Sequence, residues 1–185
     1  MNQRSPRTTN WRAVETAYQT PDITVQRTVQ EIWRASANDD KGLANNLGTP
    51  IIAQCIDVVR NAQSANDAVQ QVNRLIAISG QASLAADIAQ RAAVLSFGED
   101  DKTRSFVRSV FAEASNYLIS RDIPGYVGVG GKLNTVQDAT SLKISIMREV
   151  ASKVDSVPFS SRNISKPKTW NAFVNNIVNI LIGGK

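Results

Sequence analysis

The sequence predicts an all-α fold, an irregular bundle of about seven helices with a mobile basic N-terminal arm. Apolar residues recur every three to four positions in most segments between Asn10 and Ile182. Ser, Thr, Asn or Asp precedes these segments, and Gly or Pro separates them, as helix start and stop signals do. No segment alternates convincingly between apolar and polar residues, and no repeat period is present. A chain of 185 residues is long enough for one full hydrophobic core, so we expect one domain.

We divide this domain into a flexible basic arm at residues 1–9, a helical bundle core at 10–156, and a basic linker with a C-terminal packing helix at 157–185. The arm carries Arg4 and Arg7 among Asn, Gln, Ser, Pro and Thr, a composition that cannot pack against a core. We therefore expect it to bind an acidic partner, although a frayed terminus with incidental charge explains it as well.

Local signals place the helices in order along the chain. Thr20 and Pro21 predict the start of a second helix running to about Ala35, and Thr49 and Pro50 repeat this device. The remaining predicted helices are Trp11–Gln19, one from Ser64 or Asn66 to a stop at Gly80, one from Ser83 through Leu95, Asp100–Ser120, one opened by Thr135 and Asp138, and one capped by Thr169.

Three segments lack helical periodicity. Residues Ser36–Gly48 and Val157–Lys168 are expected to be a polar loop and an irregular basic linker. The glycine-rich Pro124–Lys132 matches neither the P-loop nor the dinucleotide-binding pattern, because Leu133 stands where each requires another residue. We expect a flexible surface loop there.

The longest helical pattern, Asp100–Ser120, is the element around which we expect the bundle to pack. On a helical wheel one side of it is apolar, and Arg104 and Arg108, one turn apart, border that side. The apolar residues are Phe106, Val107, Val110, Phe111, Ala114, Tyr117 and Leu118. The two arginines are candidate phosphate ligands; the alternative is a solvated helix edge paired with Asp100, Asp101 or Glu113.

Composition restricts the classes of function. The chain has no histidine and one cysteine, which argues against an enzyme, a metal site and a disulfide framework, and we expect no catalytic residues and no cofactor. Cys55 lies in the apolar run Ile51–Val59, so we expect a buried structural thiol. The formal charge of +5 favours a polyanionic partner, and nine Lys or Arg against four Asp or Glu from Arg121 onward account for it. No segment resembles a secretory signal or a membrane span, so we expect an intracellular protein with no membrane partner.

Three segments, taken in order, resemble the coat proteins of rod-shaped plant viruses of the tobamovirus type. They are TVQRTVQEIWRAS at Thr24–Ser36, GTPIIAQCIDVVRN at Gly48–Asn61, and DDKTRSFVRSV at Asp100–Val110. The chain departs from the family in lacking its Arg-Phe-Pro segment and in having Ala62 where a second arginine is expected. The resemblance implies a helical bundle that stacks into a rod or filament around single-stranded RNA, with Arg60 and the region from Asp100 and Asp101 to Arg108 near the phosphates.

The function that we expect is therefore that of a viral coat or nucleocapsid protein, located in the host cytoplasm and the virion. It would assemble with copies of itself around single-stranded nucleic acid, which we expect to be RNA, without reading its sequence. Alternatives are a small RNA- or DNA-binding subunit of a larger ribonucleoprotein and a non-catalytic protein-interaction scaffold. The candidate binding residues are Arg4, Arg7, Arg27, Arg60, Asp101, Arg104 and Arg108.

Overall fold

The computed structural model describes residues 9–37, 43–80, 83–97 and 101–184, and these residues form an all-α fold with no strand. The N-terminal arm predicted at residues 1–9 lies outside this range except for Thr9, which is the first residue of α1. The helices are α1 (Thr9–Gln19), α2 (Val25–Ala37), α3 (Leu43–Leu47), α4 (Pro50–Asn61), α5 (Ala65–Ser79), α6 (Leu84–Leu95), α7 (Lys102–Asp122), the 3₁₀ helix η1 (Ile123–Tyr126), α8 (Val136–Asp155) and α9 (Pro167–Leu181).

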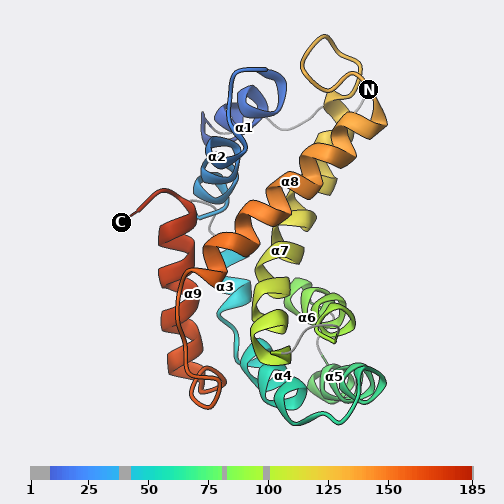
Figure 1. Cartoon of the computed structure of the whole chain (residues 1–185), viewed down its shortest axis with the longest axis vertical. Coiled ribbons are helices and arrows are strands. Elements are labelled where there is room, and N and C mark those ends of the chain that lie inside the picture. Colours follow the sequence, from blue (N-terminus) through green and yellow to red (C-terminus); the bar gives the residue numbers. More distant parts are fainter. Residues whose placement is uncertain (1–8, 38–42, 81–82, 98–100, 185) are drawn as a thin grey trace.

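The two longest helices, α7 and α8, run side by side in opposite directions along the long axis of the molecule (Figure 1). Helices α4, α5 and α6 lie at the end where α7 begins, and α1 and α2 lie toward the other end. Helix α9 contacts α8, α2, α3 and α4. Different helices therefore surround α7 at its two ends. The connection from α8 to α9 lies at the end that holds α4.

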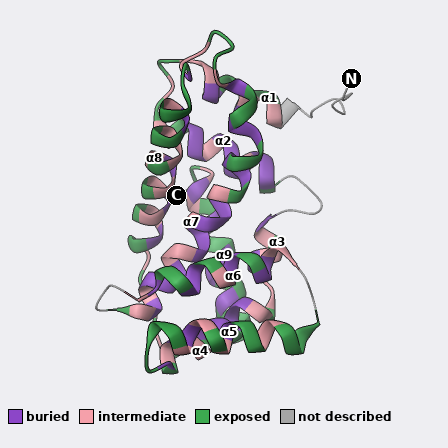
Figure 2. Ribbon diagram, turned by 90° about the vertical axis from the view of Figure 1, so that its right-hand side faces the viewer, coloured by how far each residue is buried: buried purple, intermediate pink, exposed green. Residues whose placement is uncertain are grey.

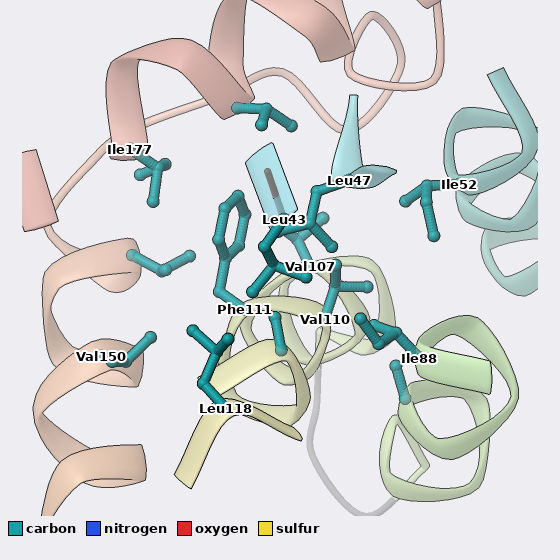
Figure 3. Packing of buried hydrophobic residues seen from close by; sticks show 14 of the residues in the cluster. Leu43, Leu47, Ile52, Ile88, Val107, Val110, Phe111, Leu118, Val150 and Ile177 are labelled. Carbon is teal, nitrogen blue, oxygen red and sulfur yellow. The ribbon is translucent and has the colours of Figure 1, made fainter. Parts of the chain in front are cut away.

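Helix α7 is the centre of the core, as its long apolar pattern predicts. Buried side chains from α3, α4, α6, α8 and α9 converge on it in Figure 3, and Figure 2 shows it as largely buried. Because α4, α6 and α8 all pack against α7, even Ser105 and Ser115 are buried. The prediction that Tyr117 belongs to the buried apolar side of α7 is wrong. This residue is 45% exposed because it faces a groove between α6 and α7 and not the core.

An aromatic cluster joins α7 to α2 and α9. The ring of Phe111 lies 6.3 Å from Trp33, 6.0 Å from Trp170 and 6.2 Å from Phe173, measured between ring centroids. Both indole N–H groups are satisfied, because Trp33 donates to Ser115 Oγ at 3.1 Å and Trp170 donates to the carbonyl oxygen of Leu47 at 2.6 Å. The apolar stripe of α9 thus packs in the core of its own chain.

Capping side chains fix several helix starts where the sequence predicts them. Ser64 and Ser83 accept hydrogen bonds from backbone N–H groups three residues later, and Thr135 and Asp138 form a reciprocal capping box. Gly80 ends α5 in the left-handed conformation, with φ of 66°, which glycine adopts without steric cost. These elements follow from local chemistry alone.

Three local predictions are wrong. Residues 20–24 precede α2 as a turn, and Thr24 provides the cap by accepting a hydrogen bond from the N–H of Arg27 at 3.1 Å. The expected polar loop contains α3, which forms because Leu43 and Leu47, one turn apart, both bury their side chains. Helix α9 begins at Pro167, two residues before the expected cap, because proline suits the first helical position.

The glycine-rich segment after α7 is a loop that packs on α1. Its first residues form η1, and Tyr126 and Leu133 are buried. The N–H of Lys132 donates to the carbonyl oxygen of Gln19 at 3.1 Å. A Cβ at Gly131 would lie 3.1 Å from backbone atoms of Gln19, so this approach favours glycine. These contacts anchor the ends of the loop to α1, while residues 128–130 at its tip are exposed, as expected of a surface loop.

Cys55 is fully buried, as predicted, and burial raises the pKa of its thiol from 9.0 to about 12. Because only the thiolate reacts, at neutral pH we expect about a thousandfold less reactive species than for a free cysteine. We predict that a disulfide reagent labels the native protein slowly and the urea-unfolded protein rapidly. Equal labelling rates in the two states would contradict the buried position.

Candidate nucleic-acid interface

The amino end of α7 presents a capped helix start and two cations. Asp101 Oδ1 accepts a hydrogen bond from the N–H of Arg104 at 3.0 Å, so this carboxylate serves as the helix cap. Lys102 Nζ donates to the carbonyl oxygen of Ala62 at 2.6 Å, next to the end of α4. The cap orients the first turn of α7, and with it the arginine that follows.

Arg104 is held by stacking on an aromatic ring. Its guanidinium carbon lies 4.6 Å from the centroid of Phe159, a residue of the connection between α8 and α9. Phe159 in turn packs edge-on against Phe173 of α9, at 5.3 Å between centroids. Within the described residues the guanidinium N–H groups of Arg104 donate to no acceptor. Stacking therefore orients this cation and leaves its five N–H donors available.

Arg108, one turn further along α7, contacts the end of α8. Its Nη1 lies 3.0 Å from Asp155 Oδ2, and the side chain of Arg108 is 20% exposed against 38% for Asp155. One acidic partner of Arg108 is therefore on another helix, at the end of α8. The carboxylate covers one edge of the guanidinium and leaves part of it in solvent.

Arg60, in the last turn of α4, holds the same connection from the other side. Its Nη1 donates to the carbonyl oxygens of Ser161 at 2.7 Å and Arg162 at 3.1 Å, and its Nη2 pairs with Asp57. Its side chain is 27% exposed. Arg60 thus fixes the path of the connection as well as adding positive charge.

The structure brings four predicted binding residues, Arg60, Asp101, Arg104 and Arg108, to one end of the bundle. The three arginines all contact residues of the segment 155–165, although they come from α4 and α7. Three more exposed cations lie on this connection and at the start of α9: Arg162, Lys166 and Lys168. We call the three arginines and these three residues the basic cluster.

Arg162, Lys166 and Lys168 are not among the binding residues predicted from the sequence. The basic composition of the linker could have indicated them, but composition does not show which helices the linker contacts. No neighbouring residue indicates that Phe159 belongs to the site, because its partner Arg104 is distant in the chain.

The other predicted binding residues lie elsewhere or outside the described range. Arg27 is on α2, toward the opposite end of the bundle, where it pairs with Glu31 at 3.0 Å and is 57% exposed (Figure 1). The same carboxylate accepts Arg34, so Arg27 belongs to a surface ion network. Arg4 and Arg7 lie outside the residues that the structure describes.

The basic cluster combines positive charge, spare N–H donors and a part-exposed aromatic ring. Such a surface suits a phosphate backbone, whose contacts give affinity without discriminating between base sequences. In the part of the chain that the structure describes, no group of three potential metal ligands occurs. Nor is any described helix both long and apolar enough to cross a membrane.

Comparison with known proteins finds no matching family model, no matching curated protein and no matching solved structure.

Proposed function

We propose that this protein packages single-stranded RNA as a viral coat or nucleocapsid protein, assembling with copies of itself around the strand. The observation that carries the proposal is Arg104, which stacking on Phe159 orients while its N–H groups keep no described acceptor. A planar guanidinium held in this way is suited to phosphate oxygens. The other cations of the basic cluster extend this contact over several phosphates.

The resemblance of three segments to tobamovirus-type coat proteins supports the same proposal from the sequence. Two of those segments contain Arg60 and the Asp101–Arg108 stretch, which lie together at one end of the bundle. Repetition along a strand would multiply weak and sequence-independent contacts. On this proposal the protein acts in the host cytoplasm and in the virion.

Electron microscopy of the purified protein, with and without a long single-stranded RNA of arbitrary sequence, tests the proposal. We expect long particles that form with RNA and that form equally with unrelated RNA sequences. A protein that binds RNA only as discrete small particles would instead be a subunit of a larger ribonucleoprotein. Absence of RNA binding at low salt would contradict both functions.

A further inference from the structure

A cavity of about 440 Å³ lies between the end of α7, η1 and the start of α8. It is at the end of the bundle opposite the basic cluster (Figure 1). A concave and mostly apolar cavity of this size, with a few polar groups, is the usual form of a small-molecule binding site. Six of the nine lining residues are apolar: Ile119, Ile123, Pro124, Val127, Val136 and Ala139.

The apolar lining extends from a buried floor to the solvent. Ile119 and Ile123 are buried, whereas Val136, in the first turn of α8, is 75% exposed. Ala139 lies on α8, which packs against α7 along its length, so the two helices form opposite walls. An aliphatic chain in this cavity would remove apolar surface of both helices from water.

Lys143 is the only charged residue among the described residues that line the cavity. Its side chain forms no ion pair or hydrogen bond with the described part of the chain. The hydroxyl of Ser120 donates to Asn116 Oδ1 at 2.9 Å. The hydroxyl of Thr140 donates to the carbonyl oxygen of Val136 at 3.0 Å. The ammonium group of the lysine is therefore the donor that a ligand can use.

The acidic residues next to the cavity in sequence have other partners. Asp122 is 6% exposed and pairs with Arg121 at 3.3 Å. The carboxylate of Asp138 accepts hydrogen bonds from the N–H groups of Asn134 and Thr135 at 3.0 and 2.9 Å, at the cap of α8. None of the described lining residues is acidic, so an anionic group in the cavity would meet the lysine without a competing carboxylate.

We propose that this cavity binds a free aliphatic carboxylate, with its chain on the apolar floor and its carboxylate at Lys143. The apolar lining favours the chain, and a single cation matches one anionic group and not a polyanion such as RNA. This site goes beyond the packaging of RNA and does not depend on it. Octanoate serves as the probe, and we expect one site per chain with a Kd of about 1 mM or below.

Titration calorimetry with octanoate, octanol and octylamine, below the concentrations at which they form micelles, tests the role of the charge. Lys143→Gln should weaken octanoate binding about fivefold and leave octanol binding nearly unchanged. Lys143→Glu should bind octylamine more tightly than octanoate, the reverse of the wild-type order. As the control, Arg148→Gln removes an exposed cation of α8 outside the cavity and should bind like the wild type. Equal octanoate affinity in the wild type and both Lys143 variants would overturn the proposal.

Thr140→Phe tests the position of the chain. Thr140 is exposed at the cavity, so the larger ring should occupy part of it while the fold persists, which circular dichroism checks. Excluding two methylenes of the ligand would weaken octanoate and octanol alike by about 15-fold, because each buried methylene favours binding about fourfold. Ser141→Phe adds the same ring at an exposed position that does not line the cavity, and should leave both affinities unchanged. Octanoate binding that is equally strong in these two variants would place the chain elsewhere and overturn the site.

Two further ligands define the class that the site accepts. Hexanoate should bind about 15-fold more weakly than octanoate, since it lacks two methylenes. Vesicles of phosphatidylglycerol present an acyl chain and an anion in a membrane, and we expect no binding to them. Absence of octanoate binding at about 10 mM, or vesicle binding that Thr140→Phe abolishes, would overturn a free carboxylate as the ligand.

Discussion

Replacing Phe111 by alanine is expected to lower the free energy of unfolding by about 3–5 kcal/mol. Phe111 is fully buried and its ring contacts aromatic rings from α2 and α9. Alanine would therefore leave a cavity between helices, which could be filled only if several helices moved. Domains of this size are commonly stable by about 5–15 kcal/mol, so a large part of the stability would be lost. Urea unfolding followed by circular dichroism measures the change.

Tyr117→Ala provides a matched control on the same helix. The side chain is also aromatic, but the residue is 45% exposed, so in monomeric protein we expect a loss below about 1 kcal/mol. Similar losses for the two variants would contradict the placement of Phe111 at the centre of the core and of Tyr117 outside it.

The elements that the sequence predicts well are those whose boundaries depend on nearby residues. Ser64, Ser83 and Thr135 cap helices because the backbone N–H groups that they satisfy lie three residues away. Gly80 ends α5 for a similarly local reason. Such boundaries need no knowledge of the rest of the fold.

The elements that the sequence does not predict correctly depend on a choice between two possible helix starts or on contacts with distant residues. Thr20 with Pro21 and Thr24 are both plausible helix starts, and the hydrogen bond from Arg27 to Thr24 decides between them. Helix α3 contains two asparagines and ends beside a glycine, so its composition indicates a loop. It forms because Leu43 and Leu47 bury against a core that the local sequence does not reveal.

The same distinction applies to the candidate interface. Arg60, Arg104 and Arg108 are recognisable as cations at helix edges, but their convergence on the connection after α8 joins residues far apart in the chain. The contact of Arg108 with Asp155 shows the difference most clearly. Asp155 is 47 residues away in the chain, so helical spacing gives no signal for this pair.

Replacing both Arg104 and Arg108 by glutamine is expected to weaken RNA binding by about 25-fold at 0.1 M salt. We assume one phosphate contact for each arginine, and each contact to a single strand contributes about 0.7 to the slope of log affinity against log salt. Losing two contacts therefore lowers the affinity at 0.1 M salt by a factor of about 10 to the power 1.4, which is about 25. The slope itself should fall by about 1.4 in total. Glutamine keeps much of the side-chain length while removing the charge, so titrations at several salt concentrations measure the electrostatic contribution.

The stability of this double variant distinguishes binding from structural support. It loses the part-exposed Arg108–Asp155 ion pair and the contact of Arg104 with Phe159, each worth about 0–1 kcal/mol, so the protein should remain folded. Arg12→Gln/Lys143→Gln removes the same charge from α1 and α8 away from the basic cluster, and is expected to leave the salt slope nearly unchanged. Because net charge is equal in the two variants, a general loss of attraction to RNA would affect both alike. If the cluster variant binds RNA with the affinity and slope of the wild type, or no more weakly than the control variant, Arg104 and Arg108 do not contact the phosphates and the RNA path lies elsewhere on the molecule.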